Sequence, residues 1–433
     1  MGGSFLSSIA IYCQPRLIAI FFLGVSSGLP LLLTASTLSV WLTEEGVNRA
    51  AIGAFGLVAL PYTLKWLWSP LVDRLPIPVL TRLLGRRRGW MVFTQIGLVI
   101  SLLALGTAKP VEHPIMVVLL ALMVTFCSAS QDIVIDAFRV EILDEKTYGA
   151  GAAMVVFGYR IGMLIAGAGA LYLATFFGWF VAYACMAALV GIGLVTVLLC
   201  REPVARPPHP ALSHKGRGFK EQLREAVVEP FRDFMSRPNW VWVLVFILLF
   251  KLGDAFVTRM SNPFYLAMGF SKIEIANISK VFGVIATILG GFTGGVLVNR
   301  FGIMRALLVC GLIQMFSNLV FAVQAMVGHD TSMLMVTIAV ENIAGGMATA
   351  AFVAYLSSLC HISYTATQYA LLSSVAKSGD TILASASGLM AQSMSWEMYF
   401  VGTSLLAAPA MIVLLWLIRK GGAIRNASTS SES

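Results

Sequence analysis

Apolar runs of about 20 residues recur along this chain, and each is long enough to cross a bilayer as an α-helix. Hydrophobic residues make up 58% of the 433 residues and charged residues only 12%. That is more apolar surface than a water-soluble fold of this size needs. The runs also lack the polar and apolar alternation of barrel strands. The sequence therefore predicts an all-α membrane protein.

Twelve spans are expected. They cover residues 17–41, 52–72, 89–108, 114–138, 149–175, 178–200, 240–262, 273–298, 303–327, 332–359, 364–393 and 396–418. The fifth and sixth follow each other across Phe177, Gly178 and Trp179 with almost no loop, so one kinked unit is the alternative there.

One long hydrophilic stretch divides the spans six and six. We therefore expect an N-terminal six-helix half over residues 1–200, a cytoplasmic linker over 201–238, and a C-terminal half with a short tail over 239–433. Apolar residues recur at helical spacing in the second part of the linker, which predicts an interfacial helix. They are Phe219, Leu223, Val227, Phe231 and Phe234.

The formal net charge is +9, and its placement indicates the topology. Lys and Arg in short loops stay on the cytoplasmic side. An N-terminus inside the cell assigns most of the 30 Lys and Arg to cytoplasmic segments. Both termini are therefore expected in the cytoplasm. The basic charge is explained by topology, so no nucleic-acid partner is expected.

A short motif follows the second span and recurs after the eighth. The first copy reads Ser-Pro-Leu-Val-Asp-Arg over residues 69–74, with basic residues at 86–88. The second copy, over residues 295–305, resembles the loop motif of the major facilitator superfamily. An acid or amide at a helix end can bind a neighbouring base or helix N-terminus in only one of two domain arrangements. We therefore expect a gating latch at these two loops; the alternative is that their basic residues only set the topology. The expected latch residues are Asp73, Arg74, Arg86, Arg87, Asn299, Arg300 and Arg305.

Several strings together resemble the AmpG family of muropeptide permeases over nearly the whole chain. They lie at residues 27–30, 65–74, 126–137, 158–163, 251–256, 341–342 and 366–372. The resemblance implies a major facilitator fold and proton-driven import of anhydromuropeptides across the bacterial inner membrane. It also implies an indirect role in the induction of β-lactamase.

Eleven ionisable residues fall inside the expected spans, where each charge costs at least about 2.5–3.5 kcal/mol. They are Lys65, Asp132, Asp136, Arg160, Lys251, Asp254, Arg259, Lys280, Glu341, Lys377 and Asp380. Asp132 and Asp136 share one helix face, and repulsion between two buried carboxylates favours proton uptake by one of them. We expect proton coupling at these two, with Asp254 and Glu341 as further candidates. Arg160 is the expected ion-pair partner, and a purely structural pair is the alternative.

Fixed cations suit the carboxylates of a muropeptide, and amides and aromatic rings suit its sugars. The expected substrate-binding residues are Lys65, Gln131, Arg160, Lys251, Lys280, Asn342, Tyr62, Trp66 and Tyr159. Core packing is the alternative for the three aromatic residues. Lys251 pairs with Asp254 at i, i+3, and Lys377 repeats this spacing with Asp380; each pair can simply neutralise itself. Arg259, Lys377 and Asp380 take no role from the resemblance.

The sequence contains no nucleotide loop, metal-ligand cluster or nucleophile triad, so neither a cofactor nor an enzymatic activity is expected. The expected partners are the substrate, protons and the lipid bilayer, and the expected state is a monomer. Two other interpretations remain. One is another facilitator, such as an acetyl-coenzyme A or sugar-phosphate carrier. The other is a transport-dead membrane sensor or an integral membrane enzyme.

Overall fold

The computed structural model describes residues 11–47, 58–203 and 228–429, and this part of the chain is helical, without strands. The chain forms two compact units. Unit 1 comprises residues 1–147, 154–231 and 357–374, and unit 2 comprises residues 148–153, 232–356 and 375–433. Each unit thus includes a short segment from the other half of the sequence.

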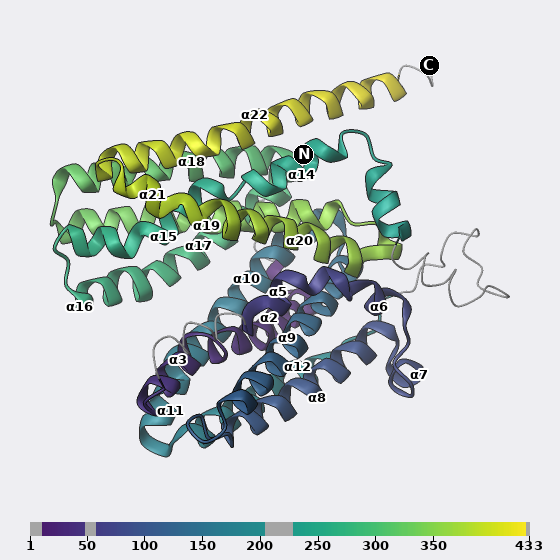
Figure 1. Ribbon diagram of the computed structural model, residues 1–433. Helices are drawn as coiled ribbons and strands as arrows, with labels where there is room; N and C mark the ends of the chain where they lie inside the picture. Colours follow the sequence, from purple (N-terminus) through teal and green to yellow (C-terminus); the bar gives the residue numbers. More distant parts are fainter. Residues whose placement is uncertain (1–10, 48–57, 204–227, 430–433) are drawn as a thin grey trace. The chain divides into compact units, whose positions relative to one another are not determined.

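Unit 1 holds the helices of the N-terminal half (Figure 1). They are η1 (Ile11–Cys13), α2 (Pro15–Leu33), α3 (Ser36–Glu44), α5 (Leu60–Leu64), η3 (Lys65–Leu67), α6 (Ser69–Arg74), α7 (Leu80–Leu84), α8 (Arg86–Gly106), α9 (Pro114–Ile142), η4 (Glu145–Thr147), most of α10 (Tyr148–Leu164), η5 (Ile165–Gly169), α11 (Ala170–Phe177) and α12 (Trp179–Leu199). The short η8 (Ile362–Tyr364) and the start of α20 (Thr365–Ile382) also belong to it.

Unit 2 holds the helices of the C-terminal half. They are α14 (Trp240–Leu249), α15 (Leu252–Ala267), α16 (Lys272–Ile275), η7 (Ala276–Phe282), α17 (Gly283–Phe301), α18 (Ile303–Val327), α19 (Thr331–Ser358), the remainder of α20, η9 (Leu383–Ala386), α21 (Ser387–Gln392) and α22 (Trp396–Thr429). Its α22 packs along α18, and its α15 along α22.

Ten stretches of the described chain are long and apolar enough to cross a membrane, and they match ten of the twelve expected spans. The fifth and sixth spans are two separate helices. Gly178, with φ of 83°, ends α11 and precedes α12. A positive φ is accessible to glycine without steric cost, which explains so short a connection.

The second and eleventh expected spans are broken helices. Residues 52–57 of the second span lie outside the described chain, and the rest forms α5, η3 and α6. A proline lies in the first turn of both α5 and α6, where its ring fits a helix start but not a helix interior. The eleventh span is α20, η9 and α21, interrupted by a 3₁₀ segment. Neither of these two expected spans is among the ten long apolar stretches.

The expected interfacial helix of the linker lies mostly outside the described residues. Only residues 228–235 of that region are described, and they are helical.

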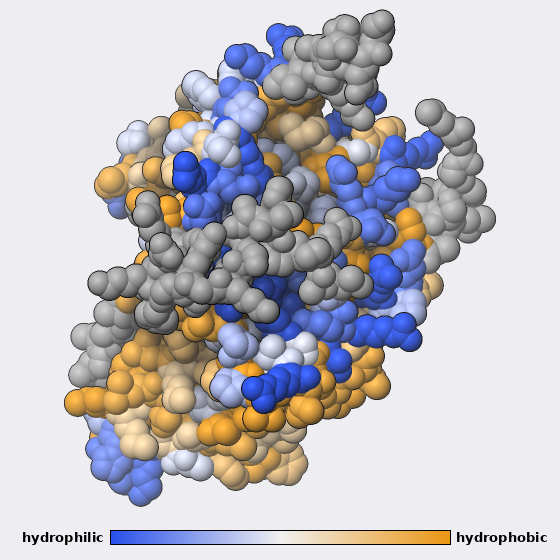
Figure 2. Space-filling view, turned by 90° about the vertical axis from the view of Figure 1, so that its right-hand side faces the viewer, coloured by the Kyte–Doolittle hydropathy of each residue, from blue (hydrophilic) through white to orange (hydrophobic). Residues whose placement is uncertain are grey.

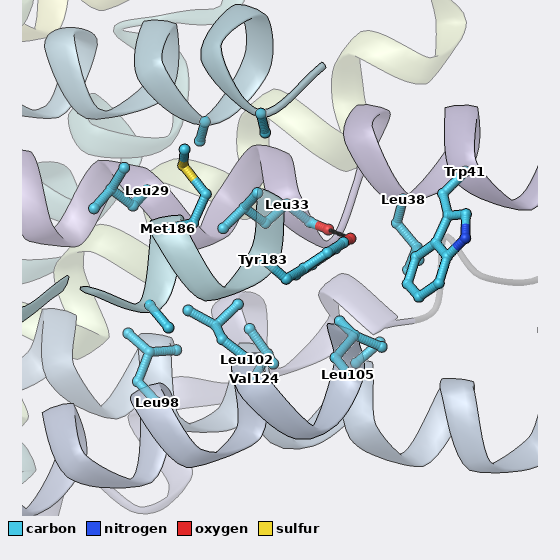
Figure 3. Packing of buried hydrophobic residues seen from close by; sticks show 14 of the residues in the cluster. Leu29, Leu33, Leu38, Trp41, Leu98, Leu102, Leu105, Val124, Tyr183 and Met186 are labelled. Carbon is cyan, nitrogen blue, oxygen red and sulfur yellow. Dashed lines mark hydrogen bonds between the residues drawn. The ribbon is translucent and has the colours of Figure 1, made fainter. Parts of the chain in front are cut away.

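Apolar side chains from several helices fill the core of unit 1 (Figure 3). Leu29 and Leu33 of α2 meet Leu98 and Leu102 of α8, together with α3, α9 and α12. The hydroxyl of the buried Tyr183 donates to the carbonyl of Leu33 at 2.8 Å. An interior tyrosine needs such a partner, because an unmet buried hydroxyl is costly. This core holds α2 and α9, the two helices that carry the acidic pair and its hydroxyl partner.

Glycines let α2 and α10 approach backbone to backbone. A Cβ at Gly158 would collide with the carbonyl oxygen of Phe21, and one at Gly28 with that of Tyr159. Small residues at such crossings are typical of membrane helix pairs, where close van der Waals packing replaces the hydrophobic effect.

Figure 2 faces the end of unit 1 where α6 and α7 lie, and hydrophilic residues gather over that end. Hydrophobic residues cover much of the surface along the lower part of this view. Exposed apolar side chains of α8 belong to such surface, among them Phe93, Ile96 and Ile100. Lipid, rather than water, is the suitable solvent for such helix faces.

Candidate functional site

Asp132 and Asp136 lie one helical turn apart on α9, inside unit 1. The hydroxyl of Ser27, on α2, donates to Asp132 Oδ1 at 2.5 Å. Ser27 was part of one of the strings that resemble a known family, but its chemical role was not predicted. The contact joins the acidic face of α9 to the glycine-rich face of α2.

Asp136 forms ion pairs with two cations. Lys65 Nζ lies 3.8 Å from Asp136 Oδ2, and Arg139 Nη2 lies 3.2 Å from Asp136 Oδ1. The predicted partner, Arg160, makes no ion pair or hydrogen bond with any residue that the structure describes. Lys65 lies in the 3₁₀ helix η3, and this break in the span places its side chain near Asp136. Arg139 lies three residues after Asp136 on the same face of α9.

Arg139 is a residue that the sequence analysis missed, because its position near a span end suggested only a topology signal. Its side chain is fully buried. Its Nη1 donates to Ser357 Oγ at 2.9 Å, and its guanidinium lies 5.1 Å from the ring centre of Tyr369. Arg139 therefore connects Asp136 to the segment of residues 357–374. The i, i+3 spacing from Asp136 was the available signal.

The predicted aromatic residues lie near the acidic pair in differing environments. Tyr62 donates to Ser128 Oγ at 2.9 Å, one turn from Asp132. Trp66 is half-buried and packs on the apolar cluster around α6, α8 and α9. Tyr159 is half-buried on α10 beside the α2 crossing.

Gln131, predicted to bind sugar hydroxyls, is buried. Its Nε2 donates to Ser26 Oγ at 3.2 Å, and only 1% of the residue is exposed. Gln131 therefore lies within the helix packing of unit 1 in this structure.

Unit 2 contains a separate charged network around Lys251 and Asp254. The predicted pair is present, with Lys251 Nζ 3.3 Å from Asp254 Oδ2. Lys251 also donates to Thr349 Oγ1 at 2.9 Å, and Gln314 Nε2 donates to Asp254 Oδ1 at 3.3 Å. Thr349 and Gln314 were not predicted, since they come from α19 and α18, far away in the sequence.

Glu341 and Asn342 form a second polar group of unit 2. Asn342 Nδ2 donates to Glu341 Oε2 at 2.7 Å, and Asn342 Oδ1 accepts from Thr287 Oγ1 at 2.8 Å. These contacts join α19 to α17. Lys280 belongs to the π-helical η7, but its side chain lies outside the described part.

The three remaining intramembrane charges were given no role. Arg259 and Lys377 are exposed, and the side chain of Asp380 lies outside the described part.

The first copy of the latch motif forms a dense polar cluster inside unit 1. Arg87 is buried and contacts two acids: its Nη2 lies 2.7 Å from Asp73 Oδ1 and 2.5 Å from Glu141 Oε1. Asp73 also accepts from the backbone N–H groups of Ala366 and Thr367, at 3.3 and 2.8 Å. These donors are in the first turn of α20, where the helix dipole favours an acid. Asp73 thus contacts both a base and a helix N-terminus.

Arg86 and Arg74 extend this cluster. Arg86 Nη1 donates to the carbonyl of Asp73 at 2.5 Å, and the Arg74 guanidinium lies 5.6 Å from the ring centre of Tyr364. Thr365 Oγ1 accepts from Arg87 at 2.8 Å and donates to Glu141. Glu141 was not predicted as part of the latch.

The second copy of the motif is different. Arg300 and Arg305 are exposed, and Asn299 is half-buried. Within the described chain, the side chains of Asn299 and Arg305 make no hydrogen bond or ion pair. Asn299 stands where the first copy has the charged Asp73, so it lacks the charge that holds the first copy together.

The comparisons with known proteins agree with this fold. The Major Facilitator Superfamily profile matches residues 17–327. The anhydromuropeptide permease of Escherichia coli is 39% identical over 409 residues, covering 94% of this chain and 80% of that protein. A putative transporter AmpG 4 of Rickettsia felis is 36% identical over 424 residues, covering 95% and 98%.

Solved structures of low sequence identity share the fold. The Escherichia coli fucose:proton symporter superposes with a TM-score of 0.68 at 11% identity, covering 94% of this chain and 98% of that one. A bacterial homologue of the iron transporter ferroportin gives 0.67 at 13% identity, covering 93% and 98%. The chain therefore belongs to the major facilitator superfamily of membrane transporters, and within it to the AmpG-like permeases.

Proposed function

We propose that this protein is a proton-coupled importer of anhydromuropeptides in the inner membrane of a bacterium, with both termini in the cytoplasm. The proposed substrate rests on one observation, the 39% identity to the anhydromuropeptide permease of Escherichia coli across 94% of the chain. Imported fragments of this kind would then reach cytoplasmic regulators, which is the proposed indirect link to β-lactamase induction.

The acidic pair on α9 supports proton coupling. Asp136 is balanced by Lys65 and Arg139, whereas the contact made by Asp132 is with the neutral hydroxyl of Ser27. A carboxylate that accepts from a hydroxyl is easier to protonate in a low-dielectric site than one that forms ion pairs. We therefore assign the coupling proton to Asp132 first, with Asp136 as the acid that releases Lys65 and Arg139 when its own charge changes.

Basic residues in both units support an anionic substrate. Lys65 and Arg160 lie in unit 1, and Lys251 and Lys280 in unit 2. An anion that enters a cavity of low dielectric constant needs fixed positive charge far more than it does in water. In this proposal the four bases supply positive charge for the peptide carboxylates, and Glu341 offsets part of the field so that the substrate can leave.

The polar cluster around Asp73 supports alternating access. Arg87 joins Asp73 and Glu141 to the first turn of α20, a helix of the C-terminal half. In the proposed cycle this contact forms in one state and breaks in the other, as expected for a latch.

Uptake by inside-out or right-side-out membrane vesicles tests the transport proposal. Vesicles containing the protein should accumulate labelled anhydromuropeptide only when a proton gradient is imposed, and an ionophore should abolish the accumulation. Vesicles without the protein are the control. Uptake that reaches equal levels with and without the gradient would rule out proton coupling, and no uptake of any anhydromuropeptide would rule out the substrate.

A second comparison tests the role of the bases. Lys251→Gln should weaken uptake of the peptide-bearing substrate more than uptake of the disaccharide core whose lactyl carboxyl is blocked as an amide. Lys109→Gln is the control, because Lys109 is exposed and pairs with Glu112 in a loop. Equal loss for both substrates would assign Lys251 to conformational change instead.

A further inference from the structure

A large cavity opens at the polar end of unit 1, next to the latch cluster. Its volume is about 1300 Å³. All of its walls belong to unit 1: the start of α2, the ends of α9 and α12, the chain between α6 and α8, and η8. Neither the acidic pair Asp132 and Asp136 nor the Lys251 network lines it, so it is distinct from the proposed transport site.

Four arginines line this cavity: Arg16, Arg74, Arg86 and Arg201. Two of them are held by neutral carbonyl groups. Arg16 Nη1 donates to the carbonyl of Ile142 at 3.2 Å, and Arg86 Nη1 donates to that of Asp73 at 2.5 Å. A backbone carbonyl positions a guanidinium without cancelling its charge, so both guanidinium groups keep their positive charge in the cavity.

Three of the four acids that line the cavity are engaged by groups that do not line it. Asp73 and Glu141 are bound to the buried Arg87. Glu202 accepts from the backbone N–H groups of Arg87 and Arg88, at 2.8 and 3.0 Å, at the start of α8. The fourth acid, Asp144, is exposed. The cavity is therefore suited to an anion with several oxygen atoms, and guanidinium groups bind phosphate with two parallel hydrogen bonds.

The rim of the cavity is apolar and exposed. Ile18 is 41% exposed, Phe22 39% and Leu199 81%. Ile18 and Phe22 lie on one face of α2, which is a membrane span, and Leu199 ends another span. Free phosphate gains nothing from such a rim, whereas a phospholipid has acyl chains that cover it. Basic pockets between helices at the cytoplasmic side of membranes bind anionic lipid headgroups for this reason.

We propose that this cavity binds the phosphate headgroup of an anionic glycerophospholipid. Arg16, Arg86 and Arg201 contact the phosphate, and the acyl chains lie along Ile18, Phe22 and Leu199. Because Arg86 also contacts Asp73, a bound lipid stabilises the latch cluster in the arrangement seen here.

Lipid binding to the purified full-length protein in neutral detergent tests this proposal. The probes are dioleoylphosphatidylglycerol, dioleoylphosphatidylcholine and inorganic phosphate, and the readouts are native mass spectrometry and the thermal unfolding midpoint. The test variant is Arg16→Gln with Arg201→Gln, since neither residue belongs to the latch. The matched control is Arg82→Gln with Lys146→Gln, which removes the same charge from exposed positions of unit 1 outside the cavity.

We expect phosphatidylglycerol to bind and to raise the unfolding midpoint, and phosphatidylcholine to do so much less. The test variant, which lacks two arginines, should bind phosphatidylglycerol about 30-fold more weakly, since each basic residue near a membrane surface contributes about 1 kcal/mol to anionic lipid binding. The control variant should bind it like the unchanged protein. Equal loss in both variants, or equal binding of both lipids, would overturn the proposal. Stabilisation by inorganic phosphate as large as that by phosphatidylglycerol would overturn the assignment to a lipid.

Discussion

Two carboxylates one turn apart on α9 have different surroundings, and that difference bears on which acid moves a proton. Asp136 lies 3.2 Å from Arg139 and 3.8 Å from Lys65, whereas Asp132 accepts from the hydroxyl of Ser27. A hydroxyl stabilises a carboxylate less than a cation does, and it can also serve a protonated acid as an acceptor. The same side-chain type can therefore have two functions on one helix face.

Asp132→Asn should abolish concentrative uptake while it leaves substrate exchange intact, because an amide cannot carry the coupling proton. Asp136→Asn should reduce uptake and also weaken the fold, since it leaves Lys65 and the buried Arg139 without their acid. Vesicle accumulation and counterflow measure the two effects separately. The exposed Glu112→Gln is the control. Accumulation that persists in both Asn variants with unchanged pH dependence would remove these acids as proton sites.

Arg87→Leu should destabilise unit 1 strongly, by about 3–5 kcal/mol, because removal of one member of a buried ion-pair cluster leaves the others uncompensated. Arg87 is 1% exposed and contacts both Asp73 and Glu141. The free energy of unfolding of the reconstituted protein, measured by denaturant titration, checks this. Arg82→Gln, on the exposed surface of α7, should change it by less than about 0.5 kcal/mol. Similar values for the two variants would contradict the buried cluster.

At the scale of elements, the helices of this protein are shaped by where the backbone must approach or break. Proline starts α5 and α6, so the second span is interrupted and Lys65 is carried on a 3₁₀ turn near α9. Glycine allows α2 and α10 to cross at backbone distance. These local features bring the charged side chains of different helices together.

Gly158→Ala should lower the thermal unfolding midpoint by several degrees, because the added methyl group meets the carbonyl oxygen of Phe21 on α2. Gly191→Ala on α12 is the matched control, since nothing lies within 4 Å of its added methyl group. There, replacement of a helical glycine should be neutral or should stabilise by up to about 1 kcal/mol. Equal midpoints for the two variants would show that the α2 and α10 crossing can relax.

A capping box starts α16, which precedes the long apolar stretch Asn277–Phe301 of the structure, so the eighth span begins later than the expected residue 273. Glu274 accepts from the N–H and the hydroxyl of Ser271, at 2.8 and 2.7 Å, and its own N–H donates back to Ser271 Oγ at 3.2 Å. The hydrogen bonds from Ser271 hold the pKa of Glu274 below its usual value. Because folding lowers this pKa, the ionised carboxylate of Glu274 stabilises the folded state at pH values above the ordinary pKa of glutamate. This stabilisation is lost as the pH falls through the lowered pKa of the folded state.

Glu274→Gln should therefore increase amide hydrogen exchange over residues 271–275 near neutral pH and should have less effect as the pH falls. Comparison of the variant with the unchanged protein at each pH cancels the intrinsic pH dependence of exchange. Thr331 and His329 also face this carboxylate, so Thr331→Val serves to separate their contribution. A difference that does not shrink in acid would mean that the charge of Glu274 has no part in the cap.

At the scale of the whole molecule, the distribution of Lys and Arg predicts the orientation in the membrane. We expect a reporter fused after Ser433 to be active only in the cytoplasm, because the basic loops should remain on that side. Paired fusions of alkaline phosphatase and green fluorescent protein measure this, with a fusion after Lys109 as the control for the opposite side. Periplasmic activity of the Ser433 fusion would overturn the orientation and the even number of spans.

Much of the fold was predictable because a membrane span is recognised from the composition of a short stretch of sequence. Ten spans, the break at Gly178 and the Lys251 and Asp254 pair follow from apolar runs, a single glycine and an i, i+3 spacing. The strings that resemble a known family pointed to the superfamily and to the AmpG-like permeases. These features depend on residues close together along the chain, or on a pattern that needs no geometry.

Only the tertiary structure decided which charges meet. Arg139 rather than Arg160 pairs with Asp136, Glu141 completes the cluster around Arg87, and Gln131 is buried within the helix packing. These outcomes depend on how helices distant in sequence rotate and cross, as α2 and α10 do at their glycines. The sequence by itself determined that this chain is a helical membrane protein, because hydrophobic length is a local quantity, and its resemblance to a known family indicated a transporter. Packing decided the partner of each buried charge, because a charge in a low-dielectric interior pairs with whichever group the helix crossings bring within a few ångströms.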